Sequence, residues 1–170
     1  MVVWLIGVSG SGKSTLGDLI KEYLDGQRVK NFLIDGDEVR QFFNNDLGYD
    51  EQGRRENIKR IILASYYLEK NRIVPIVCNI SPFENLREFA RHKLRDYNQI
   101  FLRKDIQIAQ QHDVKGVYQN NMEVSPLVGI DMAFEDPKHS ELVINVDCEE
   151  KDVSFATIKH FLDAKIKNGI

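Results

Sequence analysis

The chain has 170 residues, of which 42% are hydrophobic and 29% are charged, so it can bury one sizeable core and has an ordinary globular composition. Its formal net charge of −3 provides no global basic field, which argues against a nucleic-acid-binding protein. No apolar run reaches membrane-spanning length, and the apolar start, Val2–Ile6, is too short for a signal sequence. We therefore expect a cytoplasmic protein with no membrane partner.

Strand and helix patterns alternate along the chain, which predicts an α/β fold with a parallel five-stranded sheet and helices on both faces. The run Val2–Ile6 is typical of a central parallel strand, and an amphipathic helix over Ser14–Leu24 follows it. The other predicted strands are Asn31–Asp35, Ile73–Ile80, Gln99–Leu102 and Leu142–Val146. The other predicted helices are Asn57–Lys70, a helix that begins in the capping box Ser81-Pro82-Phe83-Glu84 and runs to about Tyr97, and Asp152–Lys167. We predict one domain over residues 1–170, in which the weakly periodic stretch at about 112–139 is a lid.

A glycine-rich loop joins the first strand to the first helix. Residues 7–14, Gly-Val-Ser-Gly-Ser-Gly-Lys-Ser, match the phosphate-binding pattern G-x-x-x-x-G-K-[ST] in its proper context. Backbone N–H groups of such a loop converge on phosphate oxygens, Lys13 reaches the β- and γ-phosphates, and the Ser14 hydroxyl is a Mg²⁺ ligand. We assign the binding of ATP and Mg²⁺ to Gly7, Ser9, Gly10, Ser11, Gly12, Lys13, Ser14 and Thr15.

This loop alone also fits a GTPase, a motor or an ATP-dependent binding module. The segment Asp50-Glu51-Gln52-Gly53 imitates the D-x-x-G switch element of a GTPase, but no N-K-x-D motif for guanine accompanies it. We therefore predict that this segment is an ordinary loop.

Two carboxylates, Asp35 and Asp37, follow the second predicted strand. Ligands bind at the carboxyl edge of open parallel sheets, so both lie where a phosphoryl acceptor would sit. One can support Mg²⁺ and the other can accept the proton of an attacking hydroxyl, and the pattern leaves open which of them is the base. The alternative without function is a common Asp-Gly turn.

Several motifs from Val3 to about Val146 resemble, in order and with fitting gaps, those of the adenylylsulfate (APS) kinase family. They are Ile34-Asp35-Gly36-Asp37-Glu38-Val39-Arg40, Leu47-Gly48-Tyr49, Arg54-x-Glu56-Asn57-Ile58, Ile80-Ser81-Pro82-Phe83, Asp113-x-Lys115-Gly116-x-Tyr118 and Gly129-Ile130-Asp131. The resemblance implies a P-loop kinase fold and transfer of the γ-phosphate of ATP to the ribose 3′-hydroxyl of a small nucleotide.

The same resemblance implies roles for individual residues. Asp37 would be the base, Asp35 would support Mg²⁺, and Lys13 would complete the catalytic set. Lys115 would cover the ATP phosphates from the lid. The acceptor would be bound by Asp37, Arg40, Tyr49, Arg54, Asn57, Ile80, Ser81 and Leu127, with Tyr49 in place of a phenylalanine that stacks on the base. We place Ser81 at the N-cap of its helix, and a homodimer is expected because the family tends to form dimers.

The predicted lid departs from the family pattern in the part that covers the acceptor. Ser125 takes the place of a lysine and Leu127 that of a second stacking aromatic residue. Because the phosphoryl-transfer residues are kept while these two differ, we predict a modified acceptor such as cytidine diphosphoramidate, used in capsule polysaccharide synthesis. The main alternative is an ordinary adenylylsulfate kinase that makes PAPS in sulfate assimilation. Two other classes remain, a non-catalytic nucleotide-binding regulator and a kinase of a non-nucleotide metabolite such as a sugar acid.

Overall fold

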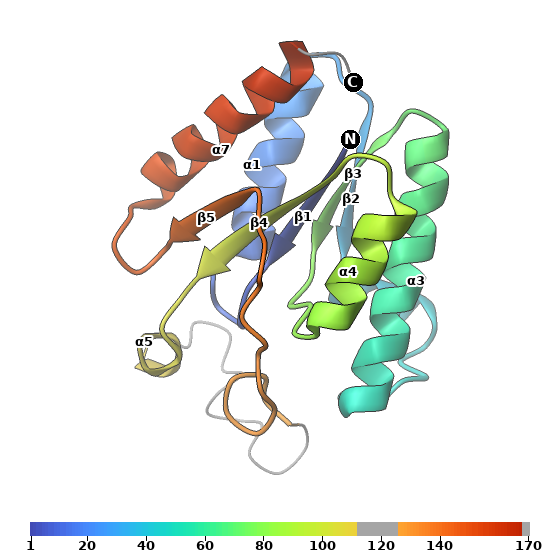
Figure 1. Ribbon diagram of the computed structural model, residues 1–170, viewed down its shortest axis with the longest axis vertical. Helices are drawn as coiled ribbons and strands as arrows, with labels where there is room; N and C mark the ends of the chain where they lie inside the picture. Colours follow the sequence, from blue (N-terminus) through green and yellow to red (C-terminus); the bar gives the residue numbers. More distant parts are fainter. Residues whose placement is uncertain (112–125, 168–170) are drawn as a thin grey trace.

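The computed structural model describes residues 1–111 and 126–167 and has a five-stranded sheet at its centre (Figure 1). The strand order is β2-β3-β1-β4-β5, and every pair of neighbouring strands is parallel. The strands are β1 (Val2–Ile6), β2 (Asn31–Asp35), β3 (Val74–Cys78), β4 (Tyr97–Arg103) and β5 (Leu142–Asn145). The predicted α/β fold with a parallel five-stranded sheet is confirmed.

Helices cover both faces of this sheet (Figure 1). Helices α1 (Lys13–Gly26) and α7 (Lys151–Lys167) lie on one face, and α3 (Glu51–Lys70) and α4 (Glu84–Lys93) lie on the other. Two short helices complete the fold: α2 (Gly36–Phe42) directly follows β2, and α5 (Ile106–Gln111) follows β4 after two intervening residues. Side chains of β1 alternate between the two cores, with Leu5 on the α1 side and Trp4 on the α3 side, which explains why this strand is apolar at every position.

Helix α3 begins at Glu51, well before the predicted start at Asn57. Asp50 is its N-cap, and the Asp50 carboxylate accepts a hydrogen bond of 2.9 Å from the backbone N–H of Gly53. A Cβ at Gly53 would lie 2.1 Å from the carbonyl oxygen of Gly48, so only glycine fits there. The prediction of a loop at residues 50–53 was therefore wrong, because the D-x-x-G pattern is a helix cap.

The predicted capping box at Ser81 was also wrong. Helix α4 begins at Glu84 with Phe83 as its N-cap, and it ends at Lys93 rather than near Tyr97, which begins β4. Ser81 instead adopts a left-handed conformation with φ of 49°. Its hydroxyl accepts hydrogen bonds of 2.9 Å from the indole N–H of Trp4 and from the side-chain amide of Asn79.

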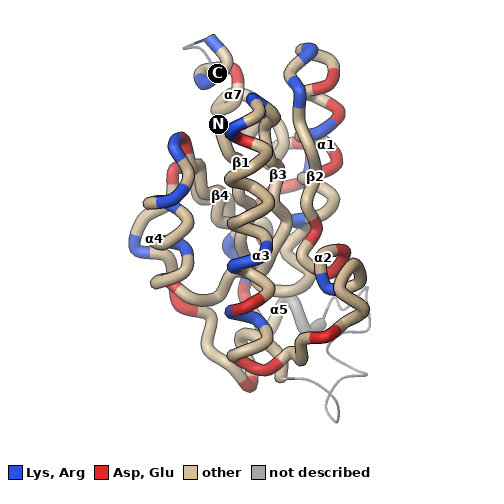
Figure 2. The backbone as a smooth tube through the Cα atoms, turned by 90° about the vertical axis from the view of Figure 1, so that its right-hand side faces the viewer, with Lys and Arg blue, Asp and Glu red and all other residues tan. Residues whose placement is uncertain are grey.

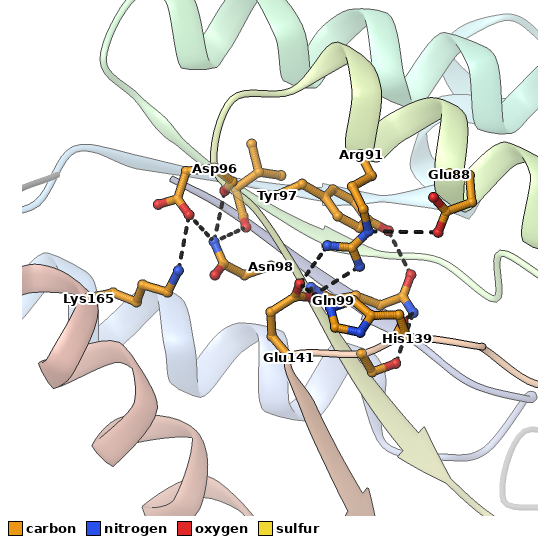
Figure 3. Close-up of polar contacts among 11 residues, drawn as sticks. Glu88, Arg91, Asp96, Tyr97, Asn98, Gln99, His139, Glu141 and Lys165 are labelled. Carbon is orange, nitrogen blue, oxygen red and sulfur yellow. Dashed lines mark hydrogen bonds and ion pairs between the residues drawn. The ribbon is translucent and has the colours of Figure 1, made fainter.

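A polar network joins α4 to the chain that enters β5 (Figure 3). The Arg91 guanidinium donates to the Glu141 carboxylate at 2.5 Å, and the same carboxylate accepts from the backbone N–H of Gln99 at 2.7 Å. The Gln99 side-chain amide donates to the carbonyl of His139 at 2.8 Å. These hydrogen bonds hold the segment before β5, at the end of the predicted lid, against α4 and β4.

Charges of both signs alternate along α3 and α1, with no continuous basic band in the view of Figure 2. Among the residues that the structure describes, no helix is long and apolar enough to cross a membrane.

Candidate active site

A cavity of about 390 Å³ opens at the carboxyl ends of the strands, where ligands bind in open parallel sheets. It is lined by the glycine-rich loop and by residues that follow β2, β3 and β4. Of the predicted site residues, it brings together Ser9, Gly10, Gly12, Lys13, Ser14, Thr15, Asp35, Asp37, Arg40, Tyr49, Arg54, Asn57, Ile80 and Ser81.

The glycine-rich loop holds the Lys13 ammonium group at its centre. Lys13 Nζ donates to the carbonyl oxygens of Gly7 at 2.8 Å and Val8 at 2.7 Å and to the Ser11 hydroxyl at 3.3 Å. A Cβ at Gly7 would lie 2.5 Å from the carbonyl oxygen of Leu102, so the loop passes too close to β4 for any other residue. The loop therefore holds a positive charge at its centre, and a loop of this kind binds phosphate through that charge together with its backbone N–H groups.

Asp35 connects the glycine-rich loop to α2. One of its oxygens accepts from the Ser14 hydroxyl at 3.2 Å, and the other accepts from the backbone N–H of Asp37 at 2.8 Å as the N-cap of α2. A hydroxyl beside a carboxylate is a donor set that suits Mg²⁺, which is usually held by one or two protein oxygens together with substrate phosphates. The described residues contain no cluster of three or more His, Cys, Asp or Glu that could hold a metal ion.

Asp37 lies at the first turn of α2 and its side chain is exposed to the cavity. Within the described part of the chain, its carboxylate accepts no hydrogen bond, whereas both oxygens of Asp35 are engaged. Asp37 is thus the carboxylate that can meet an acceptor hydroxyl without first breaking a contact.

Two arginines surround Tyr49 on the side of the cavity formed by α2 and α3. Arg40 is only 4% exposed, donates to the carbonyls of Leu47 at 3.2 Å and Gly48 at 2.9 Å, and lies 4.4 Å from the centre of the Tyr49 ring. Burial lowers the pKa of Arg40, although a guanidinium stays charged at neutral pH. Arg54 donates to the carbonyl of Tyr49 at 2.7 Å and, from its other end, to the carbonyl of Pro126 at 2.8 Å. The pair fixes the aromatic ring and places cationic groups beside it.

The Asn57 side chain is buried, and one of its polar atoms is unpaired within the described part of the chain. Its amide N–H donates to the carbonyl of Gly36 at 2.9 Å, while its carbonyl oxygen has no hydrogen-bond partner among the described residues. Since buried polar atoms are normally paired, this oxygen suits a donor group on a ligand in the cavity.

Leu127 does not line the cavity. It is 8% exposed and forms an apolar cluster with Val8, against which Ile106 and Phe134 pack. The structure therefore packs Leu127 against Val8 rather than along this cavity, and its predicted contact with the acceptor stays a prediction. Lys115 and Ser125 lie outside the described residues.

The sequence analysis missed three polar side chains at or next to the site. Asn79 and Lys104 line the cavity, and the buried Arg87 donates to the carbonyls of Ser81 at 2.7 Å and Glu135 at 2.6 Å. Asn79 and Lys104 directly follow strands β3 and β4, so the rule that ligands bind at this edge could have found them. No sequence signal identifies Arg87, whose contacts join segments that are distant along the chain.

Comparison with known proteins places this site in a family. The family model for adenylylsulphate kinase matches residues 1–145. The chain belongs to this family. A curated adenylyl-sulfate kinase from Gloeothece citriformis is 34% identical over 165 residues, covering 96% of this chain and 94% of that protein. A probable adenylyl-sulfate kinase from Bacillus subtilis is 33% identical and is covered over 86% of its length.

Solved structures support the same placement. The APS kinase CysC of Mycobacterium tuberculosis, in complex with AMPPNP and APS, superposes with a TM-score of 0.87 at 28% identity over 95% of this chain and 96% of that one. A gluconokinase from Sinorhizobium meliloti has a TM-score of 0.61 at 16% identity, a likeness of fold alone. This adenylylsulfate kinase family member is an ATP-dependent phosphotransferase that acts on a nucleotide hydroxyl.

Proposed function

We propose that this protein transfers the γ-phosphate of ATP to the 3′-hydroxyl of adenylyl sulfate. The observation that carries the proposal is the match, over nearly the full length of both chains, to curated adenylyl-sulfate kinases. The cavity supports it, because cationic side chains and an aromatic ring lie beside the carboxylates that follow β2.

In this mechanism the acceptor oxygen forms a bond to the γ-phosphorus while the bond between that phosphorus and the β,γ-bridging oxygen of ADP breaks. Asp37 accepts the proton of the attacking hydroxyl, and Lys13 stabilises charge on the transferred group. Ser14 and Asp35 would hold Mg²⁺, which neutralises charge on the phosphates when it is bound. Arg40 and Arg54 would bind the anionic tail of the acceptor.

The comparisons favour adenylyl sulfate over cytidine diphosphoramidate, the acceptor that the sequence analysis put first. The curated relatives described above carry adenylyl-sulfate kinase in their names, and none of those names mentions a cytidine nucleotide or capsule synthesis. Leu127 packs in an apolar cluster with Val8, which gives no support to the expectation that it borders a smaller base. Adenylyl sulfate, and with it a place in sulfate assimilation, is the better-supported proposal.

A direct test compares kcat/KM for adenylyl sulfate and for cytidine diphosphoramidate at fixed ATP and Mg²⁺, with phosphorus NMR to locate the new phosphate. We expect adenylyl sulfate to be preferred by at least about tenfold, the size of one charged hydrogen bond. A cytidine value equal to or above the adenylyl sulfate value would refute the proposal.

A matched pair of variants tests how the acceptor is bound. Arg54→Gln should raise KM for adenylyl sulfate with little effect on KM for ATP, whereas Lys59→Gln removes a charge from the exposed face of the same helix and should change neither. Equal effects of the two variants would contradict the assigned role of Arg54.

The single domain and the homodimer stay predictions. Light scattering of the purified chain would test whether it forms a dimer.

A further inference from the structure

Lys104 is a second lysine beside the glycine-rich loop. It directly follows β4, is half-buried, and lines the same cavity as Lys13 and Ser14. Its ammonium group donates to the carbonyl oxygen of Gly10 at 3.1 Å, although the two residues are far apart along the chain. Gly10 has a φ of 73°, is exposed and lines the cavity, so Lys104 reaches the side of the loop that faces the cavity.

The position of β4 in the sheet tells which substrate Lys104 meets. The candidate acceptor residues come from α2, from α3 and from the segments around them, and from the end of β3, all on the β2–β3 side of β1. Strand β4 lies on the opposite side of β1. Lys104 therefore approaches the loop from the side away from the acceptor, which leaves the donor nucleotide as its partner.

The charges in the cavity support the same conclusion. Arg40 and Arg54 donate to backbone carbonyls around Tyr49 and Pro126, at the acceptor side. Lys13 and Lys104 are the lysines that line the cavity within the described part of the chain. A triphosphate with Mg²⁺ keeps a net negative charge. When it binds, the Lys104 ammonium group could replace its hydrogen bond to the neutral Gly10 carbonyl with one to charged phosphate oxygens.

We propose that Lys104 is a binding residue for the triphosphate of ATP, acting from the β4 side of the glycine-rich loop. The proposal uses the binding of ATP and does not depend on the identity of the acceptor. The competing explanation is purely structural: Lys104 would only pin the turn at Gly10 and have no contact with phosphate.

Binding of AMPPNP in the presence of Mg²⁺ and without any acceptor separates the two explanations. Isothermal titration calorimetry would compare the wild type with Lys104→Gln, Lys104→Arg and Lys138→Gln at several ionic strengths. Lys138 is an exposed lysine that does not line this cavity, so Lys138→Gln controls for the loss of one charge. Because the acceptor is left out, the result is independent of whether adenylyl sulfate is the substrate.

At low salt, Lys104→Gln should weaken AMPPNP binding by about five- to tenfold, at the lower end for a charged hydrogen bond because Lys104 is partly exposed. The loss should shrink as salt screens the charge, Lys104→Arg should recover most of the affinity, and Lys138→Gln should bind as the wild type does. A wild-type affinity in Lys104→Gln, or a loss that is the same at every ionic strength, would overturn the proposal in favour of the pinning role.

Discussion

Asp35 has two separable tasks in this structure, and two substitutions distinguish them. One carboxylate oxygen caps α2 through the Asp37 N–H at 2.8 Å, and the other lies 3.2 Å from the Ser14 hydroxyl, where Mg²⁺ is expected. Asparagine keeps an oxygen for the cap but loses the negative charge, whereas alanine loses both.

The sizes of the two effects follow from these contacts. An N-cap contributes about 1 kcal/mol, which in a chain of this size corresponds to a melting temperature lower by roughly 2–4 °C. Asp35→Ala should show this loss, and Asp35→Asn should melt within about 1 °C of the wild type. Both variants lose the negative charge near the phosphates, so kcat/KM should fall by about ten- to a hundredfold in each of them.

Thermal denaturation by circular dichroism and a coupled assay of ADP release measure the two quantities on the same samples. Wild-type kcat/KM in Asp35→Asn would remove the metal-supporting role. Equal melting temperatures of Asp35→Asn and Asp35→Ala would show that the cap contributes nothing to the stability.

Three further outcomes are expected. Lys13→Ala should abolish turnover in the ADP-release assay while the circular dichroism spectrum stays native, since Lys13 stabilises charge on the transferred phosphoryl group; near-normal activity would refute this. Asp37→Asn should lower kcat far more than it raises KM for ATP, and a change confined to ATP affinity would make Asp35 the better candidate for the base. Burial opposes the charged form of Glu141, yet the Arg91 guanidinium holds the pKa of Glu141 below its ordinary value. The ion pair therefore stabilises the fold above the unfolded-state pKa and loses this effect as the pH falls through the lower folded-state pKa, so unfolding titrations should show a steeper acid loss in the wild type than in Glu141→Gln.

The strands could be predicted because each contains an apolar run that stands out from its polar surroundings, although β2 and β5 are only partly buried whereas β1 and β3 are buried throughout. Val2–Ile6 and Asn31–Asp35 have the predicted bounds. The starts of α3 and α4 were misjudged because caps depend on local geometry that several sequences share. Ser81 looks like an N-cap by spacing, yet its hydroxyl is held by Trp4, a contact between residues far apart that no local pattern reveals.

The candidate site was predictable where a motif fixes the backbone, as at Lys13 and Asp35, because the loop and the strand end set the direction of the side chain. It was less predictable at Leu127, since the direction of that side chain depends on packing against Val8. Lys104 belongs to no motif used in the prediction, and only the arrangement of β4 beside the glycine-rich loop brings it to the cavity.

Gly17 lies at the closest approach of α1 to the sheet, where a Cβ would be 2.4 Å from the sulfur of Cys78 and 3.1 Å from the side chain of Leu33. The Cys78 thiol also donates to the carbonyl of Lys13 at 3.2 Å. This contact sets the separation between α1 and the sheet, and so between the proposed donor half of the site, which follows β1, and the proposed acceptor half, which follows β2 and β3. A larger residue at position 17 would widen that separation for every acceptor alike. A change of acceptor within this scaffold is therefore expected to arise from substitutions in the segments around α2 and α3, while the packing of α1 against the sheet stays constant.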